Sequence, residues 1–315
     1  MKQFISANDI SSVNEWVEKA ISIKKNPFEF NHLGKNKTLG LVFLNPSLRT
    51  RLSSQKAAQH LGMNVMVMNL NQDGWALELE DGAVMNGNTQ EHIKEAAGVL
   101  SQYCDIIGLR TFASLNDKEK DYNEVVLKKF IQSASVPVIS LESAAGHPLQ
   151  AFADCITIAE HKKIKMPKVV LSWSPHVRAL PQAVANSFVE WVSQTDAELI
   201  VTNPKGFNLD PSILKNTPVI HNQKEAFENA DFVYAKNWSS FENYGQIRTQ
   251  HQDWIINGEK MKLTNKAKFM HCLPVRRNVV VSDEVLDSSN SLVLAQAQNR
   301  IYSAQTVLYH ILNQK

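Results

Sequence analysis

Short apolar runs of strand length alternate along this chain with amphipathic stretches of helix length. This alternation is typical of parallel β-sheets whose two faces are both covered by helices. The predicted strands are Leu41–Leu44, Val65–Leu70, Ile106–Leu109, Val136–Leu141, Val169–Trp173, Leu199–Thr202, Phe232–Ala235 and Phe269–His271. The predicted helices are Arg51–Leu61, Gln90–Tyr103, Tyr122–Ser133, Leu149–Lys163, Pro181–Ser193, Lys224–Asn229 and Arg300–Leu312. The pattern predicts an α/β protein of two domains, each with a parallel β-sheet flanked by helices.

The boundary between the two domains is expected at the helix Leu149–Lys163, since Lys165-Met166-Pro167 then opens a second series of strands and helices. A length of 315 residues suits two domains. We therefore expect a first domain over residues 1–148 and a second over 149–297. The C-terminal helix, over residues 298–315, is expected to pack back on the first domain.

Charge and cysteine content limit the partners. The chain has 33 Lys and Arg residues against 31 Asp and Glu residues, a net charge of +2, which is far from the excess of a nucleic-acid-coating protein. No apolar run approaches the length of a membrane span, and the N-terminus lacks an apolar signal core. Cys104, Cys155 and Cys272 are odd in number and widely spaced, which fits a reducing compartment. We expect a cytoplasmic protein that binds neither nucleic acid nor membrane.

Polar side chains follow almost every predicted strand, where ligands bind in open α/β sheets. Six strand ends offer cations, a carboxylate and a thiol, which could face one cleft between the domains. These residues are Ser47, Arg49, Thr50, Arg51, Arg110, Glu142, His147, Gln150, His176, Arg178, Lys236, Cys272 and Arg276.

The segment Ser47–Arg51 lies where a strand gives way to a helix, so free backbone N–H groups and the positive end of the helix dipole meet there. Ser47 and Thr50 add hydroxyl groups, and Arg49 and Arg51 add guanidinium groups that suit phosphate oxygens. The alternative is an ordinary helix N-cap at Ser47 with solvated arginines. The chain has neither a Walker loop nor a Gly-x-Gly-x-x-Gly motif, so neither familiar nucleotide cradle is present.

Three motifs in this order resemble those of transcarbamylases, which move a carbamoyl group from carbamoyl phosphate to an amine. They are Ser47-x-Arg49-Thr50-Arg51, His147-Pro148-x-Gln150 and His271-Cys272-Leu273-Pro274. The resemblance covers essentially the whole chain. It implies a two-domain α/β fold and a homotrimer with active sites shared between subunits. It implies no metal and no organic cofactor.

The resemblance also assigns roles to residues. Thr50, Arg110 and His147 would surround the carbonyl oxygen, where negative charge develops, and Gln150 would orient the carbamoyl amide. The Cys272 thiol and the Leu273 carbonyl would lie beside the carbamoyl nitrogen and the attacking amine. Trp75 looks like the residue that such relatives lend to a neighbouring subunit. The carbamoyl phosphate contacts implied are Ser47, Leu48, Arg49, Thr50, Trp75, Arg110, His147, Gln150, Cys272, Leu273 and Arg300.

Three of these residues have plainer interpretations when taken singly. His147 could be a capping or surface histidine before Pro148. Cys272 could be a small buried hydrophobe. Arg300 could be a surface arginine of the last helix.

Lys236 indicates the class of amine. Ornithine transcarbamylases resemble one another in carrying an Asp after the corresponding strand and a later Ser-Met-Gly loop, and this chain has Ala235-Lys236-Asn237-Trp238 and no Ser-Met-Gly. Exchange of a carboxylate for Lys236 disfavours a substrate with a free α-amine. An ornithine acylated at that amine is therefore the predicted substrate, with Glu142, His176, Arg178, Lys236, Arg276 and Gln90 as its binding residues.

Gln90 and Val280 bear on the acyl group. Acetyl-specific relatives resemble this chain but have Glu in place of Gln90 and Lys in place of Val280, whereas succinyl-specific relatives have Pro at the first position. Neutral Gln90 leaves room for the extra carboxylate of a succinyl group, which Glu would repel. We expect N-succinylornithine as substrate, with N-acetylornithine as the alternative. A non-catalytic carbamoyl phosphate-binding homologue, or an unrelated α/β enzyme of a phosphorylated small molecule, are the other hypotheses.

Overall fold

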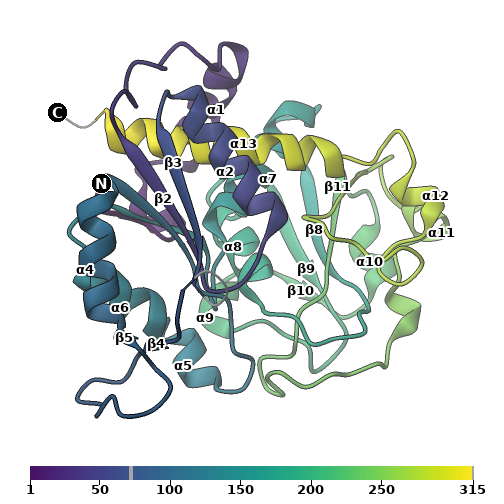
Figure 1. Ribbon diagram of the computed structural model, residues 1–315. Coiled ribbons are helices and arrows are strands. Elements are labelled where there is room, and N and C mark those ends of the chain that lie inside the picture. The colour runs from purple at the N-terminus through teal and green to yellow at the C-terminus, as the bar shows by residue number, and fades with distance from the viewer. Residues whose placement is uncertain (71–73, 314–315) are drawn as a thin grey trace. The chain divides into compact units, whose positions relative to one another are not determined.

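The computed structural model describes residues 1–70 and 74–313. The chain forms two compact units, each with its own parallel sheet flanked by helices (Figure 1), so the predicted fold class is confirmed. Unit 1 comprises Met1–Asp9, Lys19–Leu149 and Arg300–Lys315, and unit 2 comprises Ile10–Glu18 and Gln150–Asn299. Three helices contribute residues to both units, namely α1 (Val13–Lys25), α7 (Pro148–His161) and α13 (Val293–Leu312).

The main sheet of unit 1 has five strands, and every neighbouring pair is parallel. In spatial order they are β1 (Gln3–Phe4), β7 (Val138–Glu142), β6 (Ile106–Arg110), β2 (Thr38–Phe43) and β3 (Asn64–Asn69). The other elements of this unit are η1 (Ala7–Asp9), α2 (Leu48–His60), β4 (Leu77–Glu78), β5 (Glu91–His92), α4 (Ile93–Tyr103), α5 (Lys118–Tyr122) and α6 (Val125–Ser133).

Helices cover both faces of this sheet, because successive side chains of a strand point to opposite faces. Val42 packs with Leu100 of α4 and Phe130 of α6, and Figure 1 shows these two helices beside the sheet. Leu41, its neighbour on β2, lies instead among residues of α2 and of the C-terminal part of α13, including Leu308. Burial of apolar strand residues on both faces explains the near-continuous apolar runs in the sequence.

The sheet of unit 2 also has five parallel strands. In spatial order they are β10 (Val219–Ile220), β9 (Glu198–Thr202), β8 (Lys168–Trp173), β11 (Phe232–Lys236) and β12 (Lys268–Met270). The remaining elements are α8 (Ala183–Val192), α9 (Pro211–Leu214), α10 (Gln223–Phe227), η2 (Gln252–Trp254), α11 (Gly258–Met261) and α12 (Asp283–Leu286).

The two faces of this sheet also bury different partners. Val233 of β11 belongs to a core cluster with Phe227 of α10 and Leu286 of α12. Tyr234, the next residue, points the other way and lies 4.4 Å, centroid to centroid, from Phe188 of α8. The strands at the centre of each sheet are therefore held on both sides, and their carboxyl ends are fixed in position.

The observed elements differ from the prediction at several places. The prediction omitted the short strands β1, β4, β5 and β10 and the short helices α9, α11 and α12. Helix α1 was not predicted, although Val13, Trp16 and Val17 have helical spacing and are buried. Helix α13 begins at Val293 rather than near residue 298, because Val293 packs into the core of unit 2; the last two residues of the predicted span 298–315 lie outside the described residues. Gln90 was placed in a helix but precedes strand β5. No helix among the described residues is long and apolar enough to cross a membrane.

Candidate active site

The loop from β2 into α2 brings together Ser47, Thr50 and Arg300 in unit 1. Ser47 is the extended residue before α2, but its side chain makes no capping bond to the helix backbone. Its hydroxyl donates instead to Thr50 Oγ1 (3.0 Å), which also accepts from Arg300 Nη2 (2.7 Å). A hydroxyl has two lone pairs and one proton, so Thr50 is left to donate its own proton. Side-chain capping by Ser47, the plainer interpretation, is wrong.

The strands β6 and β7 end side by side on Arg110 and Glu142, and these residues form a buried ion pair. His147 Nε2 lies 3.6 Å from the same Glu142 oxygen, and all three side chains are at most 10% exposed. A buried charge is costly without a partner, which Glu142 supplies to Arg110. Arg110 Nε is also buried and makes no hydrogen bond to any described residue. A buried guanidinium nitrogen of this kind suits an anionic oxygen.

His147 follows a turn that is fixed by Glu124. The Glu124 carboxylate accepts from the backbone N–H groups of Ala144 (3.3 Å) and Ala145 (2.9 Å). Burial raises the pKa of Glu124, while these hydrogen bonds oppose the rise. His147 itself is 3% exposed, so the interpretation as a surface histidine is wrong. Arg300, at 5% exposed, is likewise not a surface arginine.

The other predicted phosphate contacts lie in the first turn of α2. Leu48 is 69% exposed, Arg49 is half-buried and Arg51 is exposed. Together with Arg110, Arg300 and His147, they make the carboxyl edge of the unit 1 sheet rich in donors and cations. The Glu142 carboxylate lies among these groups, in contact with Arg110 and His147.

Trp75 and Gln90 lie on the connection between β3 and α4. Two short parallel strands, β4 and β5, close this connection, and the backbone N–H of Gln90 donates to the Ala76 carbonyl (3.1 Å). The indole N–H of Trp75 donates to Glu91 (3.0 Å), and the side chain is 54% exposed. Gln90 is exposed as well. The structure therefore presents both residues at the surface of unit 1.

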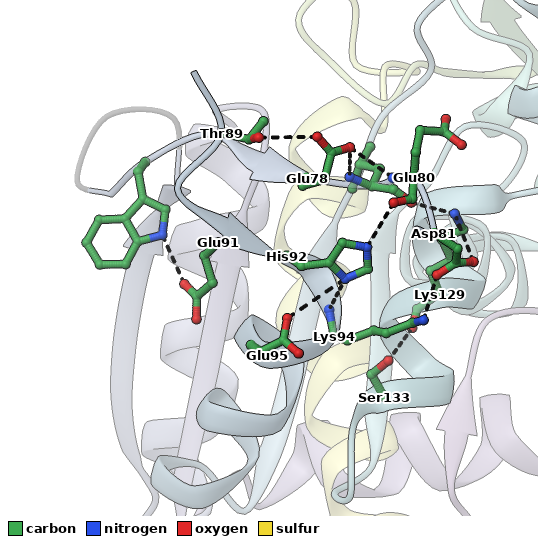
Figure 2. A network of polar contacts seen from close by, with 12 residues as sticks. Glu78, Glu80, Asp81, Thr89, Glu91, His92, Lys94, Glu95, Lys129 and Ser133 are labelled. Carbon is green, nitrogen blue, oxygen red and sulfur yellow. Dashed lines mark hydrogen bonds and ion pairs between the residues drawn. The ribbon is translucent and has the colours of Figure 1, made fainter. Parts of the chain in front are cut away.

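A charged network holds this connection against α4 and α6 (Figure 2). Lys94 binds Asp81 at 2.6 Å, and Lys129 of α6 lies 3.6 Å from the same carboxylate. The Glu78 carboxylate accepts from two backbone N–H groups and from Thr89. The Lys94 hydrogen bond holds the pKa of Asp81 below its ordinary value. These contacts are exposed and each is weak, but as a network they fix the base of the loop that carries Gln90.

In unit 2, a cluster of basic side chains forms at the ends of three strands: His176 and Arg178 after β8, Lys236 at the end of β11, and Arg276 after β12. Arg276 Nε donates to His176 Nε2 (3.3 Å), and His176 Nδ1 lies 3.1 Å from the Arg178 carbonyl. Lys236 is only 8% exposed. Asn237 donates to the Ser174 carbonyl (2.7 Å) and ties the loops after β8 and β11 together. The cluster suits carboxylate groups of a ligand.

The surroundings of His176 disfavour its charged form. Burial lowers its pKa, and the nearby charges of Lys236, Arg276 and Arg178 lower it further, while its bond to the Arg178 backbone opposes them. His176 Nδ1 lies 3.1 Å from both the carbonyl oxygen and the backbone nitrogen of Arg178, and Nε2 accepts from Arg276 Nε. Protonation would remove that acceptor and loosen the Arg276 guanidinium.

Cys272 and Leu273 follow β12. Cys272 is half-buried and forms no disulfide, and the Leu273 backbone N–H donates to His271 Nδ1 (2.9 Å). Leu273 has a φ of +57°, a left-handed conformation that is strained for a branched residue and concentrates at functional sites. Gln150, near the start of α7, donates to Asp154 one turn later (2.8 Å).

The predicted residues thus form one group within unit 1 and another within unit 2. Val280 is 2% exposed in the apolar core of unit 2, so it offers no polar contact to a ligand. Sequence reasoning missed Asp154, Tyr234 and Gln296, three buried polar residues of unit 2, although the i, i+4 pair of Gln150 and Asp154 could have been noticed. Among the described residues, no group of three or more His, Cys, Asp or Glu side chains could hold a metal ion.

Two family models match the chain. The model of the aspartate/ornithine carbamoyltransferase carbamoyl-P binding domain matches residues 2–160, and that of the Asp/Orn binding domain matches residues 181–311.

Individual relatives match over the full length. The chain is 51% identical to an N-succinylornithine carbamoyltransferase of Bacteroides fragilis (strain 638R), over 99% of both chains. It is 35% identical to an N-acetylornithine carbamoyltransferase of Xanthomonas axonopodis pv. citri (strain 306), over 100% of this chain and 97% of that one. A crystal structure of a Glu-to-Ala mutant of N-acetyl-L-ornithine transcarbamylase, complexed with carbamyl phosphate and N-succinyl-L-norvaline, has a TM-score of 0.91 at 34% identity, over 99% of this chain and 100% of that one.

The lowered pKa of His176 can be tested by NMR titration of histidine-labelled protein. Its pKa should lie below 6.5, because burial and three cations disfavour the charged ring. Lys236→Met should raise that pKa, whereas Lys163→Met, a loss of an exposed lysine elsewhere in unit 2, should leave it unchanged. A His176 pKa at or above 6.5 would contradict this account of the cluster.

Proposed function

The chain belongs to the aspartate/ornithine carbamoyltransferase family, and we propose that it transfers the carbamoyl group of carbamoyl phosphate to the δ-amine of N-succinyl-L-ornithine in arginine biosynthesis. The products are N-succinylcitrulline and phosphate. The observation that carries this proposal is 51% identity, over 99% of both chains, with a protein named for this activity. A δ-amine nitrogen forms a bond to the carbonyl carbon, the bond from that carbon to the phosphate oxygen breaks, and the amine loses a proton.

Unit 1 has the groups that carbamoyl phosphate requires. The first turn of α2, with Ser47, Leu48 and Arg49, offers backbone N–H groups, a hydroxyl and a guanidinium to the phosphate. Thr50, which accepts from Ser47 and Arg300, has its own proton to donate. Arg110, His147 and Thr50 are the catalytic residues that we assign to the developing oxyanion, since fixed donors stabilise charge that appears in the transition state. The proposed chemistry calls for neither a metal nor an organic cofactor.

Unit 2 supplies contacts to both substrates. By the family pattern, Gln150, Cys272 and Leu273 bind the carbamoyl group, and the strained Leu273 backbone supports a dedicated orientation of its carbonyl. The cluster of His176, Arg178, Lys236 and Arg276 supports binding of the two carboxylates of succinylornithine. A free α-ammonium would be repelled by the same cluster. Glu142 is paired with Arg110 in unit 1, so its assignment to the acylornithine rests on the family pattern alone.

Gln90 is the residue that we propose sets the acyl preference. The Glu-to-Ala mutant of the acetyl-specific enzyme was crystallised with a succinylated ligand, and we take the replaced glutamate to be the one that corresponds to Gln90. Gln90 is uncharged and exposed, and its backbone N–H donates to the Ala76 carbonyl. The side chain of Val280 is buried in the core and cannot contact the substrate. Val280 bears on the acyl preference only because it stands where acetyl-specific relatives have a lysine.

The proposal includes a cytoplasmic homotrimer. Leu48 and Leu52 of α2 and Met66 of the edge strand β3 are large apolar side chains that are 49–69% exposed. Exposed apolar residues beside a sheet edge favour cover by another chain. Exposed Trp75 fits the family role of a residue lent to the neighbouring subunit. Cys104, Cys155 and Cys272 form no disulfide, which suits a reducing compartment.

The reaction can be tested by assaying citrulline-type product with carbamoyl phosphate and, in parallel, ornithine, N-acetylornithine and N-succinylornithine. We expect turnover of the succinyl compound, with kcat/KM well above that for the acetyl compound, and none of free ornithine. Preference for the acetyl compound would retain carbamoyl transfer but overturn the substrate. Binding of carbamoyl phosphate without turnover of any amine would support a non-catalytic homologue instead.

Gln90→Glu should shift the preference towards N-acetylornithine. The ratio of kcat/KM for succinyl over acetyl substrate should fall by about fivefold or more, because two unit charges 4 Å apart repel by about 1 kcal/mol even in bulk water. Gln132→Glu, which adds the same charge to the exposed face of α6 in unit 1, is the matched control and should leave the ratio unchanged. If the two variants have the same ratio of kcat/KM for succinyl over acetyl substrate, Gln90 does not set the acyl preference.

The oligomeric state can be measured by sedimentation equilibrium. We expect about three times the chain mass of 35.4 kDa, and Leu52→Glu should lower the mass because a charge would be buried in the contact. A fully active species with the mass of one chain would contradict both the trimer and the sharing of Trp75.

A further inference from the structure

Asp154 of α7 is a fully buried carboxylate, with 0% of its surface exposed, in the part of unit 2 that also contains Gln150 and the Cys272 loop. Burial of a carboxylate is costly unless several donors surround it. The side-chain amides of Gln150 and Gln296 both donate to Asp154 Oδ1, each at 2.8 Å. Asp154 therefore joins two amides from two helices at one oxygen.

The backbone N–H of His271 sets the direction of these hydrogen bonds. The backbone N–H of His271, which can only donate, binds Gln296 Oε1 at 2.8 Å. With its oxygen directed there, Gln296 must turn its NH₂ group towards Asp154. The chain of bonds starts at the motif that carries Cys272 and ends at the oxygen of Asp154.

The same argument fixes the amide of Gln150. An ionised carboxylate can only accept, so the Gln150 group that faces Asp154 must be the NH₂ group. The carbonyl oxygen of Gln150 is then turned to the opposite side of the amide. Without Asp154, rotation of the amide by half a turn would exchange the two groups and reverse what Gln150 presents to a ligand.

Tyr234 lies near both Asp154 and Cys272. Burial raises the pKa of Tyr234 well above its ordinary value, and the proximity of Asp154 and Cys272 raises it further. The tyrosine therefore remains protonated and adds a hydroxyl to the surroundings of the carboxylate. Asp154 Oδ1 thus has two amide donors, and the Tyr234 ring lies near the same carboxylate.

We propose that Asp154 is a positioning residue that holds the carbonyl oxygen of Gln150 towards the substrate, where it accepts a hydrogen bond from the NH₂ group of carbamoyl phosphate. This inference rests on the proposed function, which brings carbamoyl phosphate to Gln150. It implies that Asp154 determines the choice between a carbamoyl group and an acyl group of the same shape. Acetyl phosphate, which has a methyl group in place of the NH₂ group, is the probe for that choice.

A purely structural role is the competing interpretation, since Asp154 links α7 to α13. A second link between these helices, from Asn299 Nδ2 to Thr157 Oγ1 (2.9 Å), involves neither Gln150 nor His271. Thr157 is also 0% exposed. Thr157→Val is thus a matched control that removes a buried polar link of α7 without altering the surroundings of Gln150.

The experiment measures the dissociation constants of carbamoyl phosphate and acetyl phosphate by calorimetry for wild type, Asp154→Leu and Thr157→Val. Wild type should prefer carbamoyl phosphate. In Asp154→Leu the preference should fall about fivefold, the effect of one hydrogen bond, and Thr157→Val should retain it. In the background of Gln150→Met, Asp154→Leu should change the preference no further, because Asp154 acts through Gln150.

Each outcome separates the inference from the proposed function. Failure of wild type to bind carbamoyl phosphate would overturn the proposed function. Normal preference in a folded Asp154→Leu, or an equal loss for both ligands, would overturn the inference alone. Should Asp154→Leu not fold, the side-chain NH₂ of Gln150 in glutamine-labelled wild type decides by NMR: slow exchange with solvent is expected, and exchange as fast as that of an exposed glutamine would overturn the role of Asp154.

Discussion

The parallel arrangement of the strands is the constraint on which the rest of this molecule depends. Since all strands of a parallel sheet end at the same edge, the residues that follow them gather there whatever their distance along the chain. In unit 1 this brings Arg110 beside Glu142, 32 residues apart, and in unit 2 it ties Asn237 to Ser174, 63 residues apart. The buried apolar strands hold this edge in position. The polar residues at the strand ends can differ between relatives, as Lys236 does from the Asp of ornithine transcarbamylases.

The charges at these edges are balanced in different ways in the two units. In unit 1, the carboxylate of Glu142 neutralises the charge of Arg110, and the Arg300 guanidinium donates a hydrogen bond to the Thr50 hydroxyl. In unit 2, burial and the charges of Lys236, Arg276 and Arg178 lower the pKa of His176. A cluster of cations of this kind attracts an anionic ligand. The first arrangement suits a phosphate and a developing oxyanion, and the second suits a substrate with two carboxylates.

Buried polar networks set the orientation of the hydrogen-bonding side chains in the site. A hydrogen bond to a backbone N–H or to a carboxylate has only one polarity, so His271 and Asp154 fix the amides of Gln296 and Gln150 between them. Such a network is costly if it is incomplete and gives specificity when each group has a partner. The proposed role of Asp154 would make substrate discrimination depend on a residue behind the ligand contacts as well as on the contacts themselves.

The amino-acid sequence by itself determined the fold class, the positions of the main strands within a few residues, and the three motifs that pointed to carbamoyl transfer. It did so because apolar periodicity and residue order are local properties of the chain. Helix α1 was missed, since its apolar residues alternate with Asn14, Glu15 and Glu18 and resemble a polar segment. Only the tertiary structure decided that Ser47 bonds to Thr50 and does not cap α2, that Val280 lies in the core, and that Asp154 holds Gln150. Burial and hydrogen-bond direction depend on neighbours that are distant in the sequence, and folding alone brings those neighbours together.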